Sequence, residues 1–383
     1  MGRVLVVATA GAGGDLQPLL AAALALRDRG HRTIFLGDRS VGRSLHELGL
    51  EGETLPPELD LGPTLSAAIR DAMDTTGGDL VASGPIVQVR MAEWAQQVAE
   101  PIAVAVRDHH PAAIVTSLFG VEVLSNVSPP CPWAVINSTF YVGPAPPRPL
   151  EEDFGPRAIP LIARYASLLD SASLMLHATD RTFDLAFDGL PARQHYVGPL
   201  GIWESPSEPP PYLAEPGDPW ALVTISSQLQ DDVAVAEAAL AALSGRPVRV
   251  LLTMGPDHDP GALSAVPSNA RVERTVSHSA VLERGILLVS HAGHGSVMKA
   301  LWHGRPMVLV PWGRDQPGVA ARAKALGVAE VVPRDQVSET SLSAAIDRAL
   351  TEVSMKRAAG HHASRLRATD PRATAAGLLE TLL

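Results

Sequence analysis

Polar side chains follow two predicted strands in the segment from His291 to Gln316. The first strand, residues 286–289, is apolar and runs into the turn His291-Ala292-Gly293-His294-Gly295-Ser296, where a helical pattern starts. A glycine turn that opens a helix offers free backbone N–H groups and the positive end of the helix dipole, and both attract anions such as phosphate. The second strand, residues 307–310, is followed by Asp315-Gln316. Because ligands of open parallel sheets bind at the carboxyl ends of strands, we expect both turns to face one crevice.

The same segment resembles the nucleotide-sugar site of inverting glycosyltransferases with the GT-B fold. This UDP-glycosyltransferase-like family decorates antibiotics, macrolides, sterols and plant metabolites. The match consists of His-x-Gly-x-Gly-Ser from residue 291, Gly-x-Pro from residue 304 and Pro-x-x-x-Asp-Gln from residue 311. The resemblance implies that the first motif holds the donor diphosphate and that the last one hydrogen-bonds the sugar hydroxyls. The donor-binding residues implied in this way are His291, Gly293, Gly295, Ser296, Asp315 and Gln316.

Three further positions concern the donor. Family members place a small hydroxyl residue near the donor phosphates in the loop that here holds Ser227, although a plain turn is the alternative. His278 aligns with the segment that packs on the nucleotide base, but Ser277 stands where a proline is common. Many members carry Glu at the position of Lys299, where it binds the ribose. Because a lysine cannot accept a hydrogen bond, either ribose recognition differs here or Lys299 contacts phosphate.

Asp15 is the candidate catalytic base. It lies in residues 11–18, after the first predicted strand, and this loop resembles the Gly-Asp-x-x-Pro form found in the family. In an inverting transfer, a base takes the acceptor proton while the acceptor oxygen attacks the anomeric carbon, and the nucleoside diphosphate leaves from the opposite face. A carboxylate serves well when burial raises its pKa or when the acceptor hydroxyl is acidic. The alternatives are that Asp15 only caps the helix from Leu16, and that Asp315 is the base.

Phe140 and Tyr141 follow a predicted strand at residues 133–137 and are the candidate acceptor-binding residues. Aromatic side chains more often pack in a core, which is the competing interpretation. For His294, ordinary packing at the start of a helix competes with a role near the acceptor. The polar stretch at residues 71–83 is expected to form a loop over the acceptor side.

Composition excludes several classes of protein. The net charge of −10 and the lack of a basic run argue against nucleic-acid binding. The single cysteine, Cys131, excludes an internal disulfide and a cysteine-based metal site, and fits a reducing compartment. The pairs His109-His110 and His361-His362 have no further ligands at metal spacing. The resemblance implies neither a metal nor a cofactor. Without a signal peptide or a membrane-spanning apolar run, we expect a cytoplasmic monomer or homodimer.

Strands that alternate with helices indicate an α/β protein, here the GT-B arrangement of two Rossmann-like βαβ domains with a cleft between them. Residues 1–200 form the expected acceptor-binding domain. The alternation stops in the proline-rich segment 201–218, which is the expected linker, and restarts in residues 219–371, the expected nucleotide-sugar domain. In GT-B proteins the terminal helix, here residues 372–383, crosses back to the first domain.

Three other functions fit parts of the sequence. A nicotinamide-dependent oxidoreductase would use the glycines at residues 11–14 and Asp38, but its fingerprint needs glycine where Leu16 stands. A nucleotide-sugar epimerase or phosphorylase would keep the fold, but the extra carboxylates that such epimerases use are missing at matching positions. A non-catalytic nucleotide-sugar-binding partner is suggested only by Lys299. The preferred prediction is a hexosyl- or deoxyhexosyltransferase that moves a sugar from a TDP- or UDP-sugar to a small, largely apolar natural product.

Overall fold

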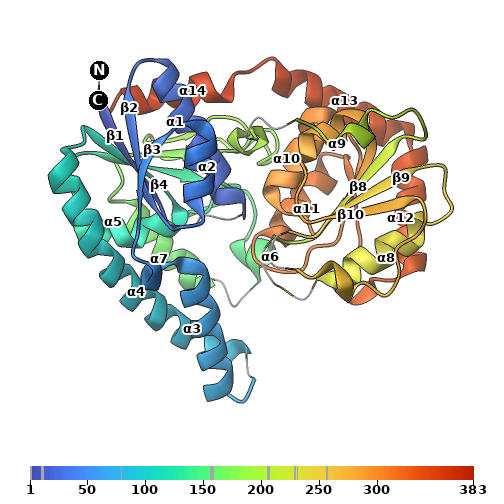
Figure 1. The fold of residues 1–383 in the computed structure, drawn as a ribbon, viewed down its shortest axis with the longest axis horizontal. Helices are drawn as coiled ribbons and strands as arrows, with labels where there is room; N and C mark the ends of the chain where they lie inside the picture. Colours follow the sequence, from blue (N-terminus) through green and yellow to red (C-terminus); the bar gives the residue numbers. More distant parts are fainter. Residues whose placement is uncertain are drawn as a thin grey trace.

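The structure, a computed structural model, describes residues 2–9, 13–78, 80–155, 159–204, 208–227, 230, 232–255 and 258–383. Their strands form two parallel sheets, which lie in two lobes side by side (Figure 1). The α/β class with two Rossmann-like sheets that the sequence predicted is confirmed.

The first sheet has seven strands among the described residues, in the order β3-β2-β1-β4-β5-β6-β7. They are β1 (Arg3–Ala8), β2 (Arg32–Gly37), β3 (Glu51–Thr54), β4 (Ala113–Ser117), β5 (Trp133–Asn137), β6 (Leu174–His177) and β7 (Gln194–Tyr196). The strand order reverses between β1 and β4, which pair in parallel. Such a reversal leaves a crevice at the carboxyl ends of the two strands. The segment that leads to Asp15 follows β1, so it begins at the point where the strand order of this sheet reverses.

The second sheet has six strands within the described ranges, in the order β10-β9-β8-β11-β12-β13. They are β8 (Trp220–Thr224), β9 (Arg249–Thr253), β10 (Ala270–Glu273), β11 (Gly285–Ser290), β12 (Met307–Leu309) and β13 (Ala329–Val331). Here the order reverses between β8 and β11. The turn that begins at His291 follows β11, so it also lies at a switch point.

The connections between strands are mostly helical. The α-helices are α1 (Leu16–Asp28), α2 (Val41–Leu48), α3 (Leu61–Thr75), α4 (Leu80–His109), α5 (Val121–Val127), α6 (Leu150–Phe154), α7 (Ile159–Leu169), α8 (Val233–Leu243), α9 (His278–Arg284), α10 (His294–His303), α11 (Gln316–Ala325), α12 (Glu339–Thr351), α13 (Val353–Arg367) and α14 (Pro371–Glu380). Short 3-10 turns lie at Gly13–Asp15, Pro57–Leu59, Leu118–Gly120, Leu200–Ile202, Pro211–Leu213, Pro260–Ala262 and Arg334–Gln336. No helix in the described ranges is both long and apolar enough to cross a membrane.

Both faces of the first sheet are buried. Val4 and Val6 of β1 belong to one apolar cluster, which includes Leu19 and Leu20 of α1. Leu5 alternates with them and belongs to a second cluster on the opposite face. Because successive side chains of a strand point to opposite faces, the continuous apolar run of β1 is what a strand covered by helices on both sides requires.

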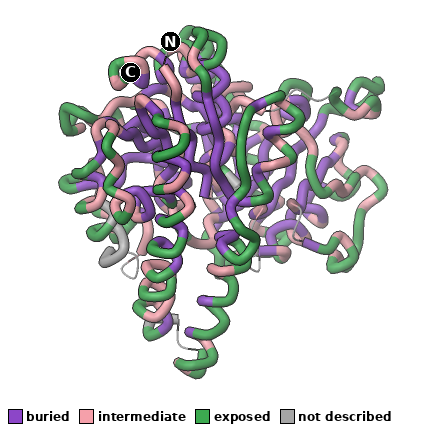
Figure 2. Tube along the Cα trace, turned by 60° about the vertical axis from the view of Figure 1, so that its left-hand side comes forward, coloured by how far each residue is buried: buried purple, intermediate pink, exposed green. Residues whose placement is uncertain are grey.

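The helical arm formed by α3 and α4 projects from the first lobe and is largely exposed (Figures 1 and 2). The prediction of a loop at residues 71–83 is wrong for most of that stretch, because α3 continues to Thr75 and α4 starts at Leu80. The polar composition that suggested a loop reflects two solvent-facing helices. Val89, with 58% of its surface exposed, lies on this arm.

The last helix, α14, packs on α1 of the first lobe (Figure 1). Ala375, Ala376 and Leu379 join the apolar cluster beneath α1. At the rim, Arg29 Nη1 lies 2.6 Å from Glu380 Oε2. The C-terminus of the chain thus contacts the lobe in which the chain begins.

A fully buried arginine joins the two lobes. Arg322 of α11 donates from Nη1 to Asp153 of α6 at 2.9 Å and from Nε to Asp184 at 2.7 Å. Its guanidinium also lies over the ring of Phe140, 3.8 Å from the centroid. Asp184 in turn accepts hydrogen bonds from Tyr141 N and from the hydroxyl of Tyr196. One cation therefore connects α11 with two carboxylates that follow β5 and β6 of the first sheet.

Replacing this arginine is expected to destabilise the protein strongly. Arg322→Met keeps much of the side-chain volume but removes the cation of Asp184 and leaves Asp153 with Arg148 alone. The expected cost is about 3–5 kcal/mol of unfolding free energy. Arg348→Met is the control, because Arg348 pairs with Glu330 while 49% of its own side chain is exposed, and such pairs contribute about 0–1 kcal/mol. Denaturant unfolding measures both, and equal losses would contradict the structural role of Arg322.

Candidate active site

The start of α10 is the predicted diphosphate site. Ala292 adopts a left-handed backbone conformation with φ of 68°, and Gly293 occupies the N-cap position. A Cβ atom on Gly293 would lie 2.6 Å from Nε2 of His291, so the close approach of this ring requires glycine. The first N–H groups of a helix have no partner within the helix. Those of Gly295 and Ser296 therefore point toward the space at the end of β11.

His291 lies beneath this helix start with 9% of its surface exposed. Its Nδ1 faces the carbonyl oxygen of Thr224, at the end of β8, at 3.4 Å. Burial lowers the pKa of His291, while the negative charge of Asp232 acts in the opposite direction. The predicted diphosphate-binding residues His291, Gly293, Gly295 and Ser296 are thus brought together at one switch point.

Asp15 stands at the N-cap position of α1 but makes no capping hydrogen bond. Its Oδ1 accepts a hydrogen bond from the hydroxyl of Ser138, which follows β5, at 2.6 Å. Burial raises the pKa of Asp15 to about 6, against the lowering effect of Ser138, and the charge of Asp315 raises it further. The side chain is thus oriented toward the neighbouring loop instead of its own helix, which the capping interpretation does not explain.

Asp315 and Gln316 begin α11 from the other side of the cleft. Asp315 makes no capping bond either, and burial raises its pKa. Gln316 accepts hydrogen bonds from Trp312 N at 2.8 Å and Gly313 N at 3.0 Å, and donates to Gln230 Oε1 at 3.1 Å. The negative charge of Asp315 also contributes to raising the pKa of Asp15, so the two carboxylates, one from each lobe, are close enough to interact electrostatically.

Lys299 is paired with a carboxylate of the segment between the two sheets. Its Nζ lies 2.8 Å from Oε1 of Glu204. Glu204 also accepts hydrogen bonds from the Ser277 hydroxyl at 2.6 Å, Ser279 N at 3.1 Å and His278 N at 3.2 Å. Burial opposes ionisation of Glu204, but Lys299, His278 and Ser277 together lower its pKa to about 2. The ion pair between Lys299 and Glu204 therefore connects the segment between the two sheets to α10.

The two remaining donor candidates lie near these groups. The backbone of Ser227 follows β8 and is approached by Gly255, where a Cβ atom would lie 2.8 Å from the Cα of Ser227. His278 opens α9, and its Nε2 lies 2.9 Å from the hydroxyl of Thr253 at the end of β9. Burial lowers the pKa of His278 to about 4, so its ring is neutral. Both residues follow strands of the second sheet, and their contacts with the donor stay predictions.

The acceptor candidates Phe140 and Tyr141 are both fully buried. The Phe140 ring packs 5.2 Å from that of Phe154 and beneath Arg322. The Tyr141 hydroxyl donates to Pro144 O at 3.0 Å. Phe140 thus lies at the contact between the lobes, whereas the Tyr141 ring packs on His177 and Phe187 of the first lobe. The role of both residues in acceptor binding stays a prediction.

His294 contacts the first lobe. Its Nε2 lies 3.0 Å from the hydroxyl of Thr179, and its ring packs edge-on against Phe183. Burial lowers its pKa to about 4. This environment favours the packing interpretation of His294.

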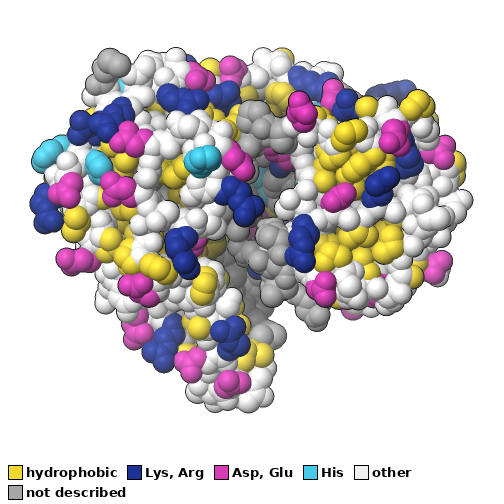
Figure 3. Space-filling model, viewed as in Figure 1, with side chains coloured by type: hydrophobic (Ala, Val, Ile, Leu, Met, Phe, Trp, Pro, Cys, Tyr) yellow, Lys and Arg dark blue, Asp and Glu magenta, His cyan; other side chains and the backbone are white. Residues whose placement is uncertain are grey.

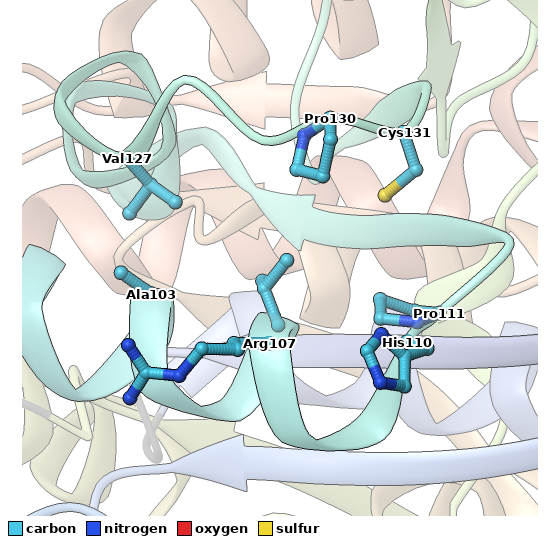
Figure 4. Close-up of a pocket in the computed structure, with 8 residues that line it drawn as sticks. Ala103, Arg107, His110, Pro111, Val127, Pro130 and Cys131 are labelled. Atoms are coloured by element: carbon cyan, nitrogen blue, oxygen red, sulfur yellow. The ribbon is translucent and has the colours of Figure 1, made fainter.

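The space-filling surface is hollowed between the lobes, with Lys and Arg side chains on both sides (Figure 3). A separate cavity of about 480 Å³ lies in the first lobe between α4 and the segment around Cys131 (Figure 4). Its lining holds none of the candidate site residues. Within the described ranges, no group of three or more His, Cys, Asp or Glu side chains is placed to hold a metal ion.

The sequence did not point to several residues of this region. Ser138, Glu204, Gln230 and Asp232 all contact candidate site residues or neighbour them, yet none stands in a recognisable motif. A motif with fixed spacing could not reveal them, because the fold brings each of them to the site from a different part of the sequence.

Comparison with known proteins agrees with this geometry. Residues 238–378 match the family described as erythromycin biosynthesis protein CIII-like, C-terminal domain. The C-terminal part of the chain thus resembles this family, and the full-length matches are antibiotic and macrolide glycosyltransferases. The chain is 25% identical to demethyllactenocin mycarosyltransferase of Streptomyces fradiae, over 97% of this chain and 85% of that protein. It is 28% identical to vancomycin aglycone glucosyltransferase of Amycolatopsis orientalis, over 98% and 97%.

Solved structures share the fold. The calicheamicin glycosyltransferase CalG4 superposes with a TM-score of 0.71 at 19% identity, covering 100% of this chain and 98% of that one. The spinosyn rhamnosyltransferase SpnG complexed with thymidine diphosphate gives a TM-score of 0.71 at 16% identity, covering 99% of both chains. Identity at this level shows the two-lobed architecture alone.

The Glu204 pair gives a pH-dependent prediction. Because folding lowers the pKa of Glu204 from 4.5 to about 2, its ionised form stabilises the protein fully above pH 4.5, and this contribution is lost as the pH falls toward 2. Glu204→Gln is expected to lower the free energy of unfolding on the order of 2 kcal/mol at neutral pH. The difference from wild type should narrow below pH 4.5. Glu208→Gln, at an exposed position of the same segment, is the control, and a difference independent of pH would contradict the assignment.

Proposed function

We propose that this protein transfers a hexosyl or deoxyhexosyl group from a TDP- or UDP-sugar to a small, largely apolar natural product, with inversion at the anomeric carbon. The names of its relatives support a natural-product acceptor, since they include a mycarosyltransferase and a vancomycin aglycone glucosyltransferase. The spinosyn rhamnosyltransferase has been solved with thymidine diphosphate and with the spinosyn aglycone. The orientation of the Asp15 carboxylate, which accepts a hydrogen bond from Ser138 and makes no capping bond to its own helix, is the observation that carries the proposal.

In this reaction the donor diphosphate lies at the N-terminus of α10, where backbone N–H groups and His291 meet its charge. Asp315 and Gln316 receive the sugar from the second lobe. The acceptor hydroxyl approaches from the first lobe, and Asp15 takes its proton as the oxygen attacks the anomeric carbon. The bond to the diphosphate breaks on the opposite face, and the configuration inverts. The donors at the helix start supply the stabilisation of the leaving group, so we propose that no metal is needed.

A pKa of about 6 suits Asp15 for this role. At neutral pH most molecules carry the carboxylate, and the group is a stronger base than an exposed aspartate with a pKa near 4. One oxygen accepts the Ser138 hydrogen bond, which leaves the other for the acceptor proton. The same carboxylate fixed as an N-cap would be less available, and the structure gives Asp15 no capping bond.

Asp15→Asn should lower kcat by about 10²–10⁴-fold, because the amide keeps the shape but cannot take a proton. Calorimetric titration with UDP, TDP and GDP should show that one nucleotide still binds the variant with wild-type affinity, whereas His291→Ala loses that binding. Asp28→Asn is the matched control, since Asp28 ends the same helix in an exposed pair with Arg372. Turnover by Asp15→Asn close to wild type would exclude Asp15 as the base, and binding of none of the nucleotides would exclude the transferase function.

The pH dependence tests the role of Ser138. The hydroxyl stabilises the ionised carboxylate and so lowers the pKa of Asp15. Activity requires the carboxylate, so kcat/KM is expected to rise with pH through about 6. Ser138→Ala removes the hydrogen bond, which should move this rise to higher pH, and Ser138→Thr should restore it. If Ser138→Ala has the same pH dependence of kcat/KM as wild type, the rise is caused by the titration of another group.

A further inference from the structure

Three buried polar atoms behind the diphosphate site lack a hydrogen-bond partner among the described residues. They are Oδ1 of Asp232 and both ring nitrogens of His258. Asp232 is fully buried and His258 is 5% exposed. Nε2 of His258 lies 3.6 Å from Oδ1 of Asp232. Because unpartnered buried polar groups are costly, a pair of this kind is expected to serve a neighbouring site.

Asp232 is held by groups of its own loop, the connection between β8 and α8. Its Oδ2 accepts from Ser226 N, after β8, at 2.8 Å and from Gln230 Nε2 at 3.0 Å. Gln230 accepts in turn from Gln316 at 3.1 Å. This chain of hydrogen bonds ties the carboxylate to the loop after β8 and to the start of α11. Asp232 therefore keeps a fixed position beside the ends of β8 and β12.

The hydrogen bond of His291 determines which form of its ring can bind an anion. The carbonyl oxygen of Thr224 only accepts, so Nδ1 must carry the proton of that bond. In the neutral ring, Nε2 is then an acceptor, and it lies beside Gly293 at the start of α10. Diphosphate oxygens are acceptors as well. A hydrogen bond from Nε2 to a diphosphate thus requires a second proton on the ring.

Asp232 and His291 contact neighbouring residues at the end of β8, since Asp232 accepts from Ser226 N and Nδ1 of His291 contacts the carbonyl oxygen of Thr224. Asp232 is the acidic group among the described residues whose charge bears on His291. Asp232, before α8, favours protonation, whereas Arg314 after β12 and His258 after β9 oppose it. His278, at the start of α9, lies close enough to be affected by His291 in its turn. Burial also disfavours the charged ring. The Asp232 carboxylate is therefore the group that can make an imidazolium acceptable at this place.

We propose that His291 takes up one proton from solvent when the donor diphosphate binds, with Asp232 as the counter-ion of the resulting imidazolium and His258 as a competing partner of Asp232. This inference rests on the proposed donor site and adds a positioning role for Asp232 and His258. The protonated ring donates from Nδ1 to Thr224 and from Nε2 to a diphosphate oxygen. After transfer, the same imidazolium holds the departing nucleoside diphosphate, and its release returns the proton to solvent.

Calorimetric titration of wild-type protein with the binding nucleoside diphosphate, in two buffers of different ionisation enthalpy, counts the protons exchanged. At about pH 8 the terminal phosphate, with a pKa near 6, is already ionised and contributes no proton. The expected result is an uptake of about one proton per site. Binding without proton uptake overturns this inference and leaves the donor site standing. Absence of binding by TDP, UDP and GDP overturns both.

Variants test the two positioning residues in opposite directions. Asp232→Asn keeps an acceptor for Ser226 N but removes the counter-ion, so proton uptake should vanish and the dissociation constant should rise about tenfold or more. His258→Gln removes the histidine that competes with His291 for Asp232. Proton uptake should therefore persist to higher pH than in wild type. Asp259→Asn is the matched control, because Asp259 adjoins His258 but is exposed, and its carboxylate accepts from Gly261 N. Unchanged proton uptake in Asp232→Asn contradicts the role of Asp232. If that variant fails to fold, the test rests on the number of protons taken up by wild type and on the pH range of uptake in His258→Gln.

Discussion

The buried ion pairs of Arg322 set the relation between the two lobes on which the cleft depends. Arg322 lies two turns into α11, the helix that begins at Gln316, and it grips Asp184 and Asp153 of the first lobe. Asp184 also holds Tyr141 N, three residues after Ser138. The arginine thus connects the start of α11 with the loop that positions Asp15. The proposed base in one lobe and the proposed sugar-binding residues in the other would need such a fixed distance, because misplacement of about 1 Å can lower a rate about 100-fold.

Buried ion pairs are a poor source of stability compared with apolar packing of the same volume. Their value here is geometric, since a planar guanidinium donates in fixed directions and accepts few alternative partners. Phe140 packs beneath the cation, and α11 approaches its ring so closely that a Cβ atom on Gly318 would lie 2.5 Å from the ring. The lobes are therefore held in one register, while Arg365 and Asp180 add a second, more exposed contact.

Local patterns predicted the parts of the protein that depend on neighbouring residues. The apolar run and the glycine turn after it predicted a strand, a turn and a helix start. The structure has the strand at Gly285–Ser290 and the helix start at His294. Contacts between distant segments could not be predicted in this way. Ser138 reaches Asp15 across 123 residues, and Glu204 pairs with Lys299 only because the interlobe segment passes α10. The polar arm at residues 71–83 misled the sequence interpretation because exposed helices and loops share a composition.

Burial moves the titratable groups around the cleft toward their neutral forms. It raises the pKa of Asp15 to about 6 and lowers that of His278 and His294 to about 4. In the proposed reaction a diphosphate brings several negative charges into this space. Because the space is poorly solvated, its electrostatic interactions are stronger than in water. The added negative charge disfavours the ionised form of Asp15 and so makes it a stronger base while the donor is in place. Departure of the nucleoside diphosphate removes that charge, and Asp15 then releases the proton it has taken from the acceptor more easily.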